Sequence, residues 1–356
     1  MRILQAKQQG KVRRGAIALG AAAAVCVGAA ACAGAPSSNG TVTKSGSSKG
    51  TPVTVQLALV PPKMIFMGFY VAQAQGFFTK NGLNVTLQAE PTGSQAVRGL
   101  AAGAGVFAAG GTDGVAAADA NGANMAAIWD YGRNDLSIIA SNNVKSIADL
   151  KGHNIGVSDK AGPAYSLTTL ALHSVGLPSN AANYVVLNGR PALVTALAAG
   201  RIQASAFHVD DGLTLIKKDP KVHVLAQMSD AAPQWWYGAV SVKRAYAQAH
   251  PKVVNEFLTA MVEADRWMYT HPSQTIALAV KDTTEDPSVV RQAYQIMSKA
   301  HDWETGAGLN PADVAFTLNA YRQDGVIPAS SKLTASQVVD TSYIKAVLSK
   351  LGPGSS

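Results

Sequence analysis

The stretch FYVAQAQGFFTKNGLNV, residues 69–85, predicts a helix that runs directly into a strand. Apolar residues recur at helical spacing over residues 66–78, and Asn81-Gly82 supplies the left-handed stop of a helix C-terminus. Apolar and polar residues alternate before this helix, over 53–59, and after it, over 83–89, which is the period of a strand. Strand, helix and strand with short connections are typical of a right-handed crossover in a parallel sheet. We therefore interpret the Phe residues of the helix as packing it against a sheet.

Two later stretches resemble each other, LAAGAGVFAAGGTDG and LAAGRIQASAFHVDDG, and they begin 97 residues apart. Each ends a helix at a glycine (Gly103 or Gly200), continues as a short apolar strand and then starts another helix. Each also has an aspartate ten residues after that glycine (Asp113 or Asp210). So long an offset predicts two lobes of similar construction rather than a short-period solenoid.

The end of the chain is different, because a helical pattern dominates from residue 244 to residue 350. Four prolines stand where a helix could begin, which is the position that tolerates proline: Pro251, Pro272, Pro287 and Pro311. We expect these helices to pack back onto the first lobe. The predicted fold is α/β with two lobes, each built on a central, mostly parallel sheet, and with a ligand cleft between them. Lobe one takes residues 53–140 plus 241–350, and lobe two takes 141–240.

The basic excess of the chain lies almost entirely at its N-terminus. The net charge is +8, yet seven of the 30 basic residues and none of the 22 acidic ones precede residue 51. The remainder has 23 basic against 22 acidic side chains and so no basic footprint for nucleic acid. A basic segment followed by an Ala-rich run over 15–31 has the layout of a signal peptide, with Arg13-Arg14 as a twin-arginine alternative to the ordinary route.

The sequence AAACAG resembles a bacterial lipobox with Cys32 as its cysteine, although Ala29 replaces the usual Leu. It predicts residues 1–32 as a lipoprotein signal peptide and lipid anchoring through Cys32 on the extracytoplasmic face; plain secretion is the alternative. Residues 33–52 are small and polar and predict a flexible tether. Because both cysteines lie before residue 33, the body can form neither a disulfide nor a cysteine metal site.

Several loops that follow predicted strands are expected to meet at the cleft, because ligands of open α/β sheets bind beyond the carboxyl ends of the strands. Ser94, Thr112, Asp113 and Asp210 are residue types that cap helices, so capping alone is the alternative for them. His208 has the alternative of a hydrogen-bonded histidine at a strand end. Of Trp235 and Trp236, we expect no more than one to face the core. The candidate ligand-binding residues are Phe66, Gly93, Ser94, Thr112, Asp113, Tyr131, Gly162, Pro163, Tyr165, His208, Asp210 and Trp236.

Four segments in order resemble the solute-binding proteins of bacterial ABC transporters, in the nitrate/sulfonate/taurine and thiamine-pyrimidine-precursor group. They are FMGFYVAQAQGFFTKNGLNV, ADLKGHNIGV, ALVTALAAGRIQA and HPKVVNEFLTAMVEADRWM, within a match over about residues 53–325. Where the family usually has Asp after the second LAAG, this chain has Gln203. The resemblance implies the type II periplasmic-binding-protein fold and capture of a small solute by cleft closure. It also implies an ABC permease and ATPase as partners, and we expect a monomer.

No catalytic or metal-binding motif is visible, so we expect a binder without cofactor rather than an enzyme. A pyrimidine-precursor-synthesising relative and a LysR-like effector domain are the alternatives of other classes. None of the loops assigned to the cleft contains Arg, and aromatic side chains are available for stacking. The expected solute is therefore a neutral or zwitterionic nitrogen- or sulfur-containing compound, such as a pyrimidine precursor or an amino-sulfonate. Nitrate or an alkyl sulfonate is the alternative.

Overall fold

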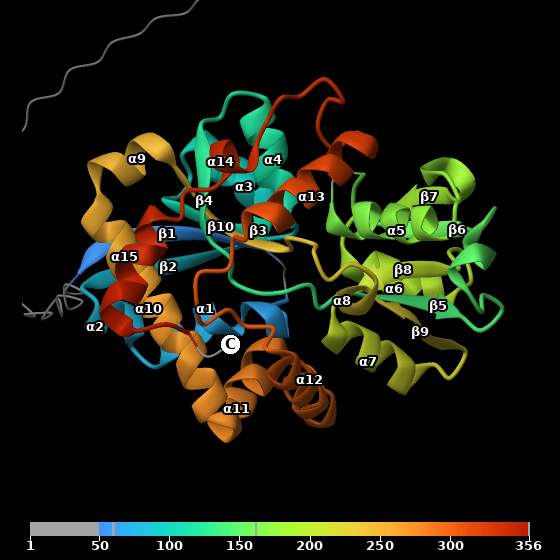
Figure 1. Ribbon diagram of the computed structural model, residues 1–356. Helices are drawn as coiled ribbons and strands as arrows, with labels where there is room; N and C mark the ends of the chain where they lie inside the picture. Colours follow the sequence, from blue (N-terminus) through green and yellow to red (C-terminus); the bar gives the residue numbers. More distant parts are fainter. Residues whose placement is uncertain (1–49, 59–60, 161, 355–356) are drawn as a thin grey trace, which may run out of the picture. The chain divides into compact units, whose positions relative to one another are not determined.

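The computed structural model describes residues 50–58, 61–160 and 162–354, and these residues belong to one compact unit. Their strands form two five-stranded sheets, one in each of two lobes (Figure 1). No helix of this part of the chain is long and apolar enough to cross a membrane. The expected signal peptide, the cysteine at position 32 and nearly all of the expected tether lie outside the described residues.

The sheet of lobe one has the strand order β2-β1-β3-β10-β4. Four strands are parallel, and β10 runs antiparallel between β3 and β4. Apolar side chains alternate along β1, where Val53, Val55 and Leu57 are buried. The strands are β1 (Thr51–Ala58), β2 (Leu83–Glu90), β3 (Phe107–Gly111), β4 (Met125–Trp129) and β10 (Gly238–Lys243).

The sheet of lobe two has the matching order β7-β6-β8-β5-β9, with β5 as the antiparallel strand. Its strands are β5 (Ser137–Ser141), β6 (Asn154–Val157), β7 (Asn183–Val186), β8 (Ala204–Phe207) and β9 (Val222–Gln227). Its helices are η2 (Ile147–Leu150), α5 (Pro163–Ser174), η3 (Ser179–Ala181), α6 (Arg190–Ala198), α7 (Val209–Lys218) and α8 (Met228–Ala231). In both lobes, therefore, the antiparallel strand is the first one after the chain has crossed from the other lobe.

The crossings run between β4 and β5 and between β9 and β10. The expected lobe limits at residues 140 and 240 fall inside β5 and β10, a few residues beyond these crossings. β1 begins at Thr51, so the last two residues of the expected tether belong to this strand.

The helix expected over 66–80 is interrupted. It consists of η1 (Met64–Phe66), α1 (Met67–Ala74) and α2 (Phe77–Lys80). Gly76 lies between the last two with a φ of 75°, a left-handed conformation that ends α1 and begins α2. The predicted stop at residue 82 is present, with a φ of 80° at Gly82.

Helices from the end of the chain pack against lobe one. Phe257 of α10 (Pro251–Thr270) stacks on Phe107 of β3 and Phe78 of α2, with ring centroids 4.2 and 5.7 Å apart. All four prolines at predicted helix starts occupy first turns, where the missing N–H costs no intrahelical bond.

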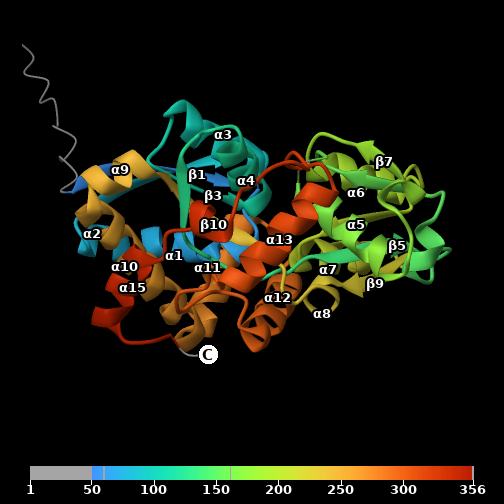
Figure 2. The same cartoon turned by 45° about the horizontal axis from the view of Figure 1, so that its top comes forward.

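The other helices of lobe one are α3 (Gly93–Ala102), α4 (Thr112–Ala120), α9 (Arg244–Ala249), α11 (Pro272–Thr283), α12 (Pro287–Ala300), α13 (Pro311–Gln323), α14 (Ala335–Val338) and α15 (Ser342–Leu351). Two of them also contact lobe two, α12 against α7 and α13 against α5 (Figure 2).

Candidate functional site

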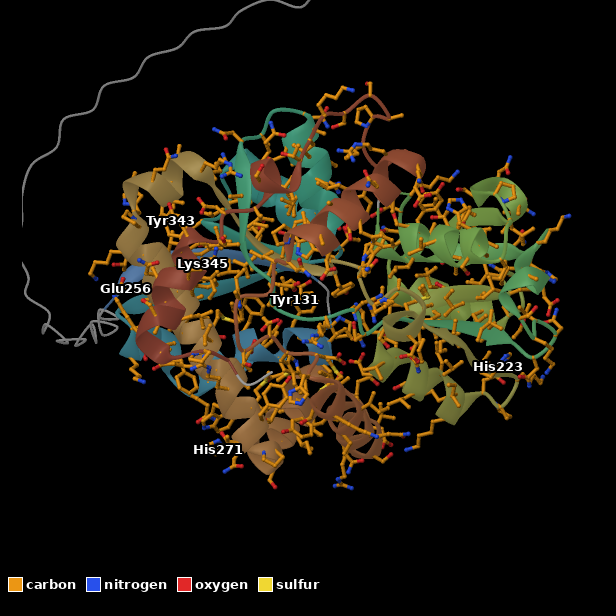
Figure 3. All side chains as sticks on the ribbon, in the orientation of Figure 1. Tyr131, His223, Glu256, His271, Tyr343 and Lys345 are labelled. Atoms are coloured by element: carbon orange, nitrogen blue, oxygen red, sulfur yellow. The ribbon has the colours of Figure 1, made fainter. Side chains whose placement is uncertain are left out.

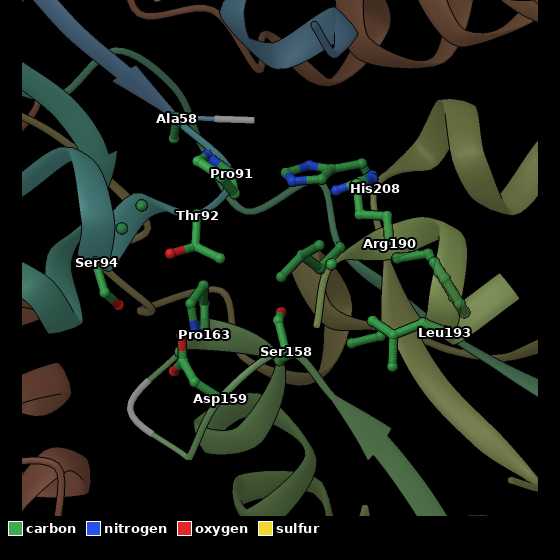
Figure 4. Close-up of a pocket in the computed structure, with 18 of the residues that line it drawn as sticks. Ala58, Pro91, Thr92, Ser94, Ser158, Asp159, Pro163, Arg190, Leu193 and His208 are labelled. Atoms are coloured by element: carbon green, nitrogen blue, oxygen red, sulfur yellow. The ribbon is translucent and has the colours of Figure 1, made fainter. Parts of the chain in front are cut away.

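A cavity lies between the lobes, with about 710 Å³ of empty space that is partly open to solvent. Residues from both lobes line it, among them Thr92 and Ser94 of lobe one and Ser158, Asp159 and Arg190 of lobe two (Figure 4).

Helix N-termini from both lobes converge on this cavity. The residues that precede the first turns of α3, α4, α5, α6 and α7 all line it: Thr92, Gly111, Gly162, Gly189 and His208. The first turn of a helix leaves N–H groups without an intrahelical partner, and the helix dipole adds positive potential there. The first turns of α4 and α7 carry aspartates that offset this potential, whereas those of α3, α5 and α6 carry none. The starts of α3 and α6 therefore favour a negatively charged group, whereas the Asp159 carboxyl lies beside the start of α5.

Glycines bring two loops of lobe one into direct backbone contact at the cavity wall. A Cβ on Gly93 would lie 2.6 Å from the Gly111 nitrogen, and one on Gly110 would lie 2.9 Å from the Gly93 Cα. No larger side chain fits without moving the backbone, so these glycines place the start of α3 against the end of β3.

Aromatic rings from lobe one and the second crossing form another wall. The ring centroid of Tyr131 lies 5.0 Å from that of Phe66, 6.0 Å from that of Phe69 and 6.4 Å from that of Tyr237. Figure 3 shows Tyr131 between the two sheets, far from His223 at the outer end of lobe two. The buried Tyr131 hydroxyl has no hydrogen-bond partner.

His208 is buried and its two ring nitrogens have protein partners. Nδ1 lies 2.8 Å from Asp135 Oδ1, and Nε2 lies 3.3 Å from the Tyr237 hydroxyl. Burial lowers the pKa of His208 well below its usual value, so the ring is neutral at physiological pH. Burial also raises the pKa of Asp135 to about 7. A neutral ring that donates from Nδ1 to Asp135 and accepts at Nε2 satisfies both contacts. The imidazole is therefore an uncharged part of the cavity wall.

Arg190 is a site residue that the sequence reading missed. It follows Gly189 at the start of α6, lines the cavity and forms an ion pair with Asp211. The loops expected at the cleft contain no Arg, but this set was incomplete, because the loop between β7 and α6 also lines the cavity. The sequence NGRP at 188–191 resembles AGP at 161–163, because both place glycine and proline at a helix start after a strand. This likeness could have indicated that the loop lies at the cleft.

The helix caps also differ from expectation. Thr92, not Ser94, caps α3, and its hydroxyl accepts from the Gln95 N–H at 3.2 Å. Ser94 lies in the first turn and donates to Asp113 Oδ2 at 3.1 Å. Asp113 and Asp210 lie in the first turns of α4 and α7, two residues beyond the cap positions Gly111 and His208.

Seven of the twelve candidate residues line the cavity: Phe66, Gly93, Ser94, Tyr131, Gly162, Pro163 and His208. The other five do not, and each has protein partners nearby. The Thr112 hydroxyl donates to the Trp236 carbonyl at 2.8 Å. Tyr165 packs edge-on against Tyr184. Asp113 lies behind Gly111, and Asp210 accepts a hydrogen bond from the N–H of Met64, the first residue of η1.

Trp235 and Trp236 are both buried, contrary to the expectation for adjacent residues of a strand. They precede β10 in irregular backbone, so strand alternation does not apply to them. Both line a second cavity beside the crossings, together with acidic residues such as Asp130, Asp302 and Glu304.

Comparison with known proteins identifies the family. The chain matches the NMT1/THI5-like family over residues 63–275. The chain belongs to the NMT1/THI5-like family. A candidate binding protein of Brucella abortus is 26% identical over 212 residues, which cover 59% of this chain and 66% of that protein. The chain thus spans just under two thirds of that relative's length. YtlA of Bacillus subtilis, also named as a candidate binding protein, is 21% identical, with 78% of this chain and 85% of that protein covered.

Solved structures confirm the fold of this NMT1/THI5-like chain. The alkanesulfonate-binding protein SsuA from Xanthomonas axonopodis pv. citri, bound to MOPS, superposes with a TM-score of 0.70 at 18% identity, covering 82% of this chain and 99% of that one. The nitrate-binding protein NrtA from Synechocystis gives 0.69 at 13% identity, covering 85% and 89%. The predicted two-lobed periplasmic-binding-protein fold is thereby confirmed. Together with the family match, the names of the relatives and of these neighbours as binding proteins agree with the expectation of a binder rather than an enzyme.

Proposed function

We propose that the chain is the extracytoplasmic solute-binding lipoprotein of an ABC importer, which captures a small zwitterionic organic solute of the amino-sulfonate type. The convergence of five helix N-termini from both lobes on one cavity is the observation that carries the proposal. A ligand that contacts both lobes stabilises their closed arrangement, and a permease can recognise that arrangement. The monomeric state and the permease and ATPase partners are part of the same proposal.

The charges around the cavity support a zwitterion rather than a simple anion. The start of α6 and the Arg190 guanidinium suit an anionic group. Asp159 lines the cavity from the other side, and a Cβ on Gly162 would lie 3.0 Å from its Oδ1. Burial first, and then the negative charge of Asp159, raise the pKa of Asp113 to about 7. The Asp159 carboxyl lines the cavity, so it can pair with an ammonium group of the solute.

The proposal is tested by a thermal-shift screen with taurine, ethanesulfonate, nitrate, bicarbonate and pyrimidine derivatives. A ligand at 100 times its dissociation constant adds about 2.7 kcal/mol of stability. Taurine and ethanesulfonate share the sulfonate, and only taurine has the ammonium group. We expect the larger shift with taurine.

A matched pair of variants identifies the ammonium site. Asp159→Asn should remove the preference for taurine over ethanesulfonate, whereas Asp149→Asn, at an exposed position of lobe two, should retain it. Equal shifts with both sulfonates, unchanged in Asp159→Asn, would favour an alkyl sulfonate as the solute. A shift with nitrate alone would reject an organic solute.

The anchor is tested separately, by metabolic labelling of the full chain and of Cys32→Ser with a fatty acid. Label is expected on the native chain only. Equal label on both chains would reject lipidation of Cys32 and leave plain secretion.

A further inference from the structure

A buried ionic network joins the two lobes beside the cavity. The Lys63 ammonium lies 2.6 Å from Asp211 Oδ1, 3.0 Å from Glu285 Oε1 and 3.9 Å from Asp210 Oδ2. Only 2% of the Lys63 side chain is exposed, so these contacts are shielded from solvent. Asp211 also pairs through Oδ2 with Arg190, which lines the cavity. We call these five residues the latch: Lys63, Arg190, Asp210, Asp211 and Glu285.

The latch combines one ion pair from each lobe with Asp210, whose carboxylate faces Lys63 across the boundary. Lys63 and Glu285 both belong to lobe one, in the loops before η1 and before α12. Arg190 and Asp211 both belong to lobe two, at the starts of α6 and α7. If the lobes separate, each cation keeps a carboxylate of its own lobe. Closure brings the two pairs together, so no member is left buried without a partner.

Further contacts across the same boundary hold this geometry. The Met64 N–H donates to Asp210 Oδ2 at 3.2 Å, and the Thr214 hydroxyl donates to Glu285 Oε2 at 2.8 Å. At the exposed edge, Lys217 pairs with Asp286 at 2.9 Å. Although burial raises the pKa of Glu285, the charge and hydrogen bond of Lys63 keep it below its ordinary value. Glu285 is therefore ionised when it meets Lys63.

We propose that Asp211 is a positioning residue that couples occupation of the cavity to closure of the lobes, through Arg190 on one side and Lys63 on the other. This inference rests on the proposed function, since it needs a solute with an anionic group. Such a group at Arg190 competes with Asp211 for the guanidinium. The charge of Asp211 is then balanced mainly by Lys63 of the other lobe, which strengthens the contact across the boundary.

The coupling is measured by a double-mutant cycle on the full chain. Lys63→Met should weaken binding of taurine by about tenfold, a typical coupling for a charge pair of this kind. In an Asp211→Asn background, the same substitution should weaken it by less than about threefold, because the partner of Lys63 across the boundary is already neutral. Lys80→Met is the matched control, since Lys80 pairs with Glu263 inside lobe one and is 63% exposed. It should leave the dissociation constant unchanged. Equal weakening by Lys63→Met in both backgrounds would overturn the coupling.

A second readout needs no solute. With both native cysteines replaced by Ser, spin labels at Val186→Cys in lobe two and Lys345→Cys in lobe one report the separation of the lobes. Lys63→Met should shift the distance distribution to longer values, and Lys80→Met should not.

The two readouts separate the possible failures. If neither taurine nor ethanesulfonate binds the native chain, the proposed solute class is wrong. The distance between the two spin labels then tests the latch without a solute. An unchanged distance distribution in Lys63→Met would overturn the latch, whether or not taurine binds.

Discussion

Replacement of Asp113 by Asn should stabilise the protein, and the gain should grow with pH. Asp113 is 1% exposed, its Oδ1 has no hydrogen-bond partner, and burial raises its pKa from 3.8 to about 7. Between about pH 4 and pH 7, the folded state therefore retains this proton, whereas the unfolded state has lost it. Because of this difference, the free energy of unfolding falls as the pH rises above about 4. One pKa unit corresponds to about 1.4 kcal/mol, which gives a cost of about 2 kcal/mol at pH 5 and about 4 kcal/mol at pH 7. Asn avoids this cost, and its amide oxygen can still accept from Ser94.

The measurement is urea denaturation of the native chain and Asp113→Asn at pH 5, 6, 7 and 8. The difference in unfolding free energy should increase by about 2 kcal/mol between pH 5 and pH 7 and then level off. Asp149→Asn is a control of opposite sign, because hydrogen bonds from the Lys145 N–H and Ser146 lower the pKa of that carboxyl. A difference for Asp113→Asn that stays flat from pH 5 to pH 8 would refute the reasoning.

Two further substitutions probe the walls of the cavity. Gly93→Ala should cost about 1–3 kcal/mol, because its Cβ would meet the Gly111 backbone, and it should weaken taurine binding. Gly122→Ala is the control, because a Cβ there meets nothing within 4 Å, although φ is 80°. It should lose stability through backbone strain, measured by denaturation, and keep its affinity for taurine, measured by calorimetry. Tyr131→Phe should be neutral or stabilising by up to about 1 kcal/mol, because the lost hydroxyl is buried without a partner. A tenfold loss of taurine affinity in Tyr131→Phe would instead make that hydroxyl a ligand contact.

The fold was predictable because its signals are local. Strand alternation, the stop at Gly82 and prolines at four helix starts each depend on a few neighbouring residues. The interruption of the first helix at Gly76 was missed, because an isolated glycine inside a helical pattern is compatible with either outcome.

The site was only partly predictable, because residues at a helix start can face either the cavity or the interior of their own lobe. Ser94 and Asp113 both lie in first turns, yet Ser94 lines the cavity and Asp113 lies behind the backbone of Gly111. Arg190 was missed for a similar reason, since only the packing of lobe two shows that the start of α6 points at lobe one. Sequence patterns identify helix starts, whereas tertiary packing decides what each of them faces.

The position of β10 has a consequence for the order of folding. The strands of lobe two come from the continuous segment 137–227, so its sheet can form as soon as that segment is available. Among the described strands of lobe one, β10 is the neighbour of β4, and it arrives after all of lobe two. The further bridge of β4, from Ala127 to Val339, involves a residue that arrives later still. Pairing of Val242 with Phe107 closes a loop of 135 residues, an entropic cost that local contacts do not share. Until β10 inserts, β3 and β4 have unpaired edges that other chains can join. Insertion of this single strand is therefore the step at which a newly made chain is most exposed to aggregation.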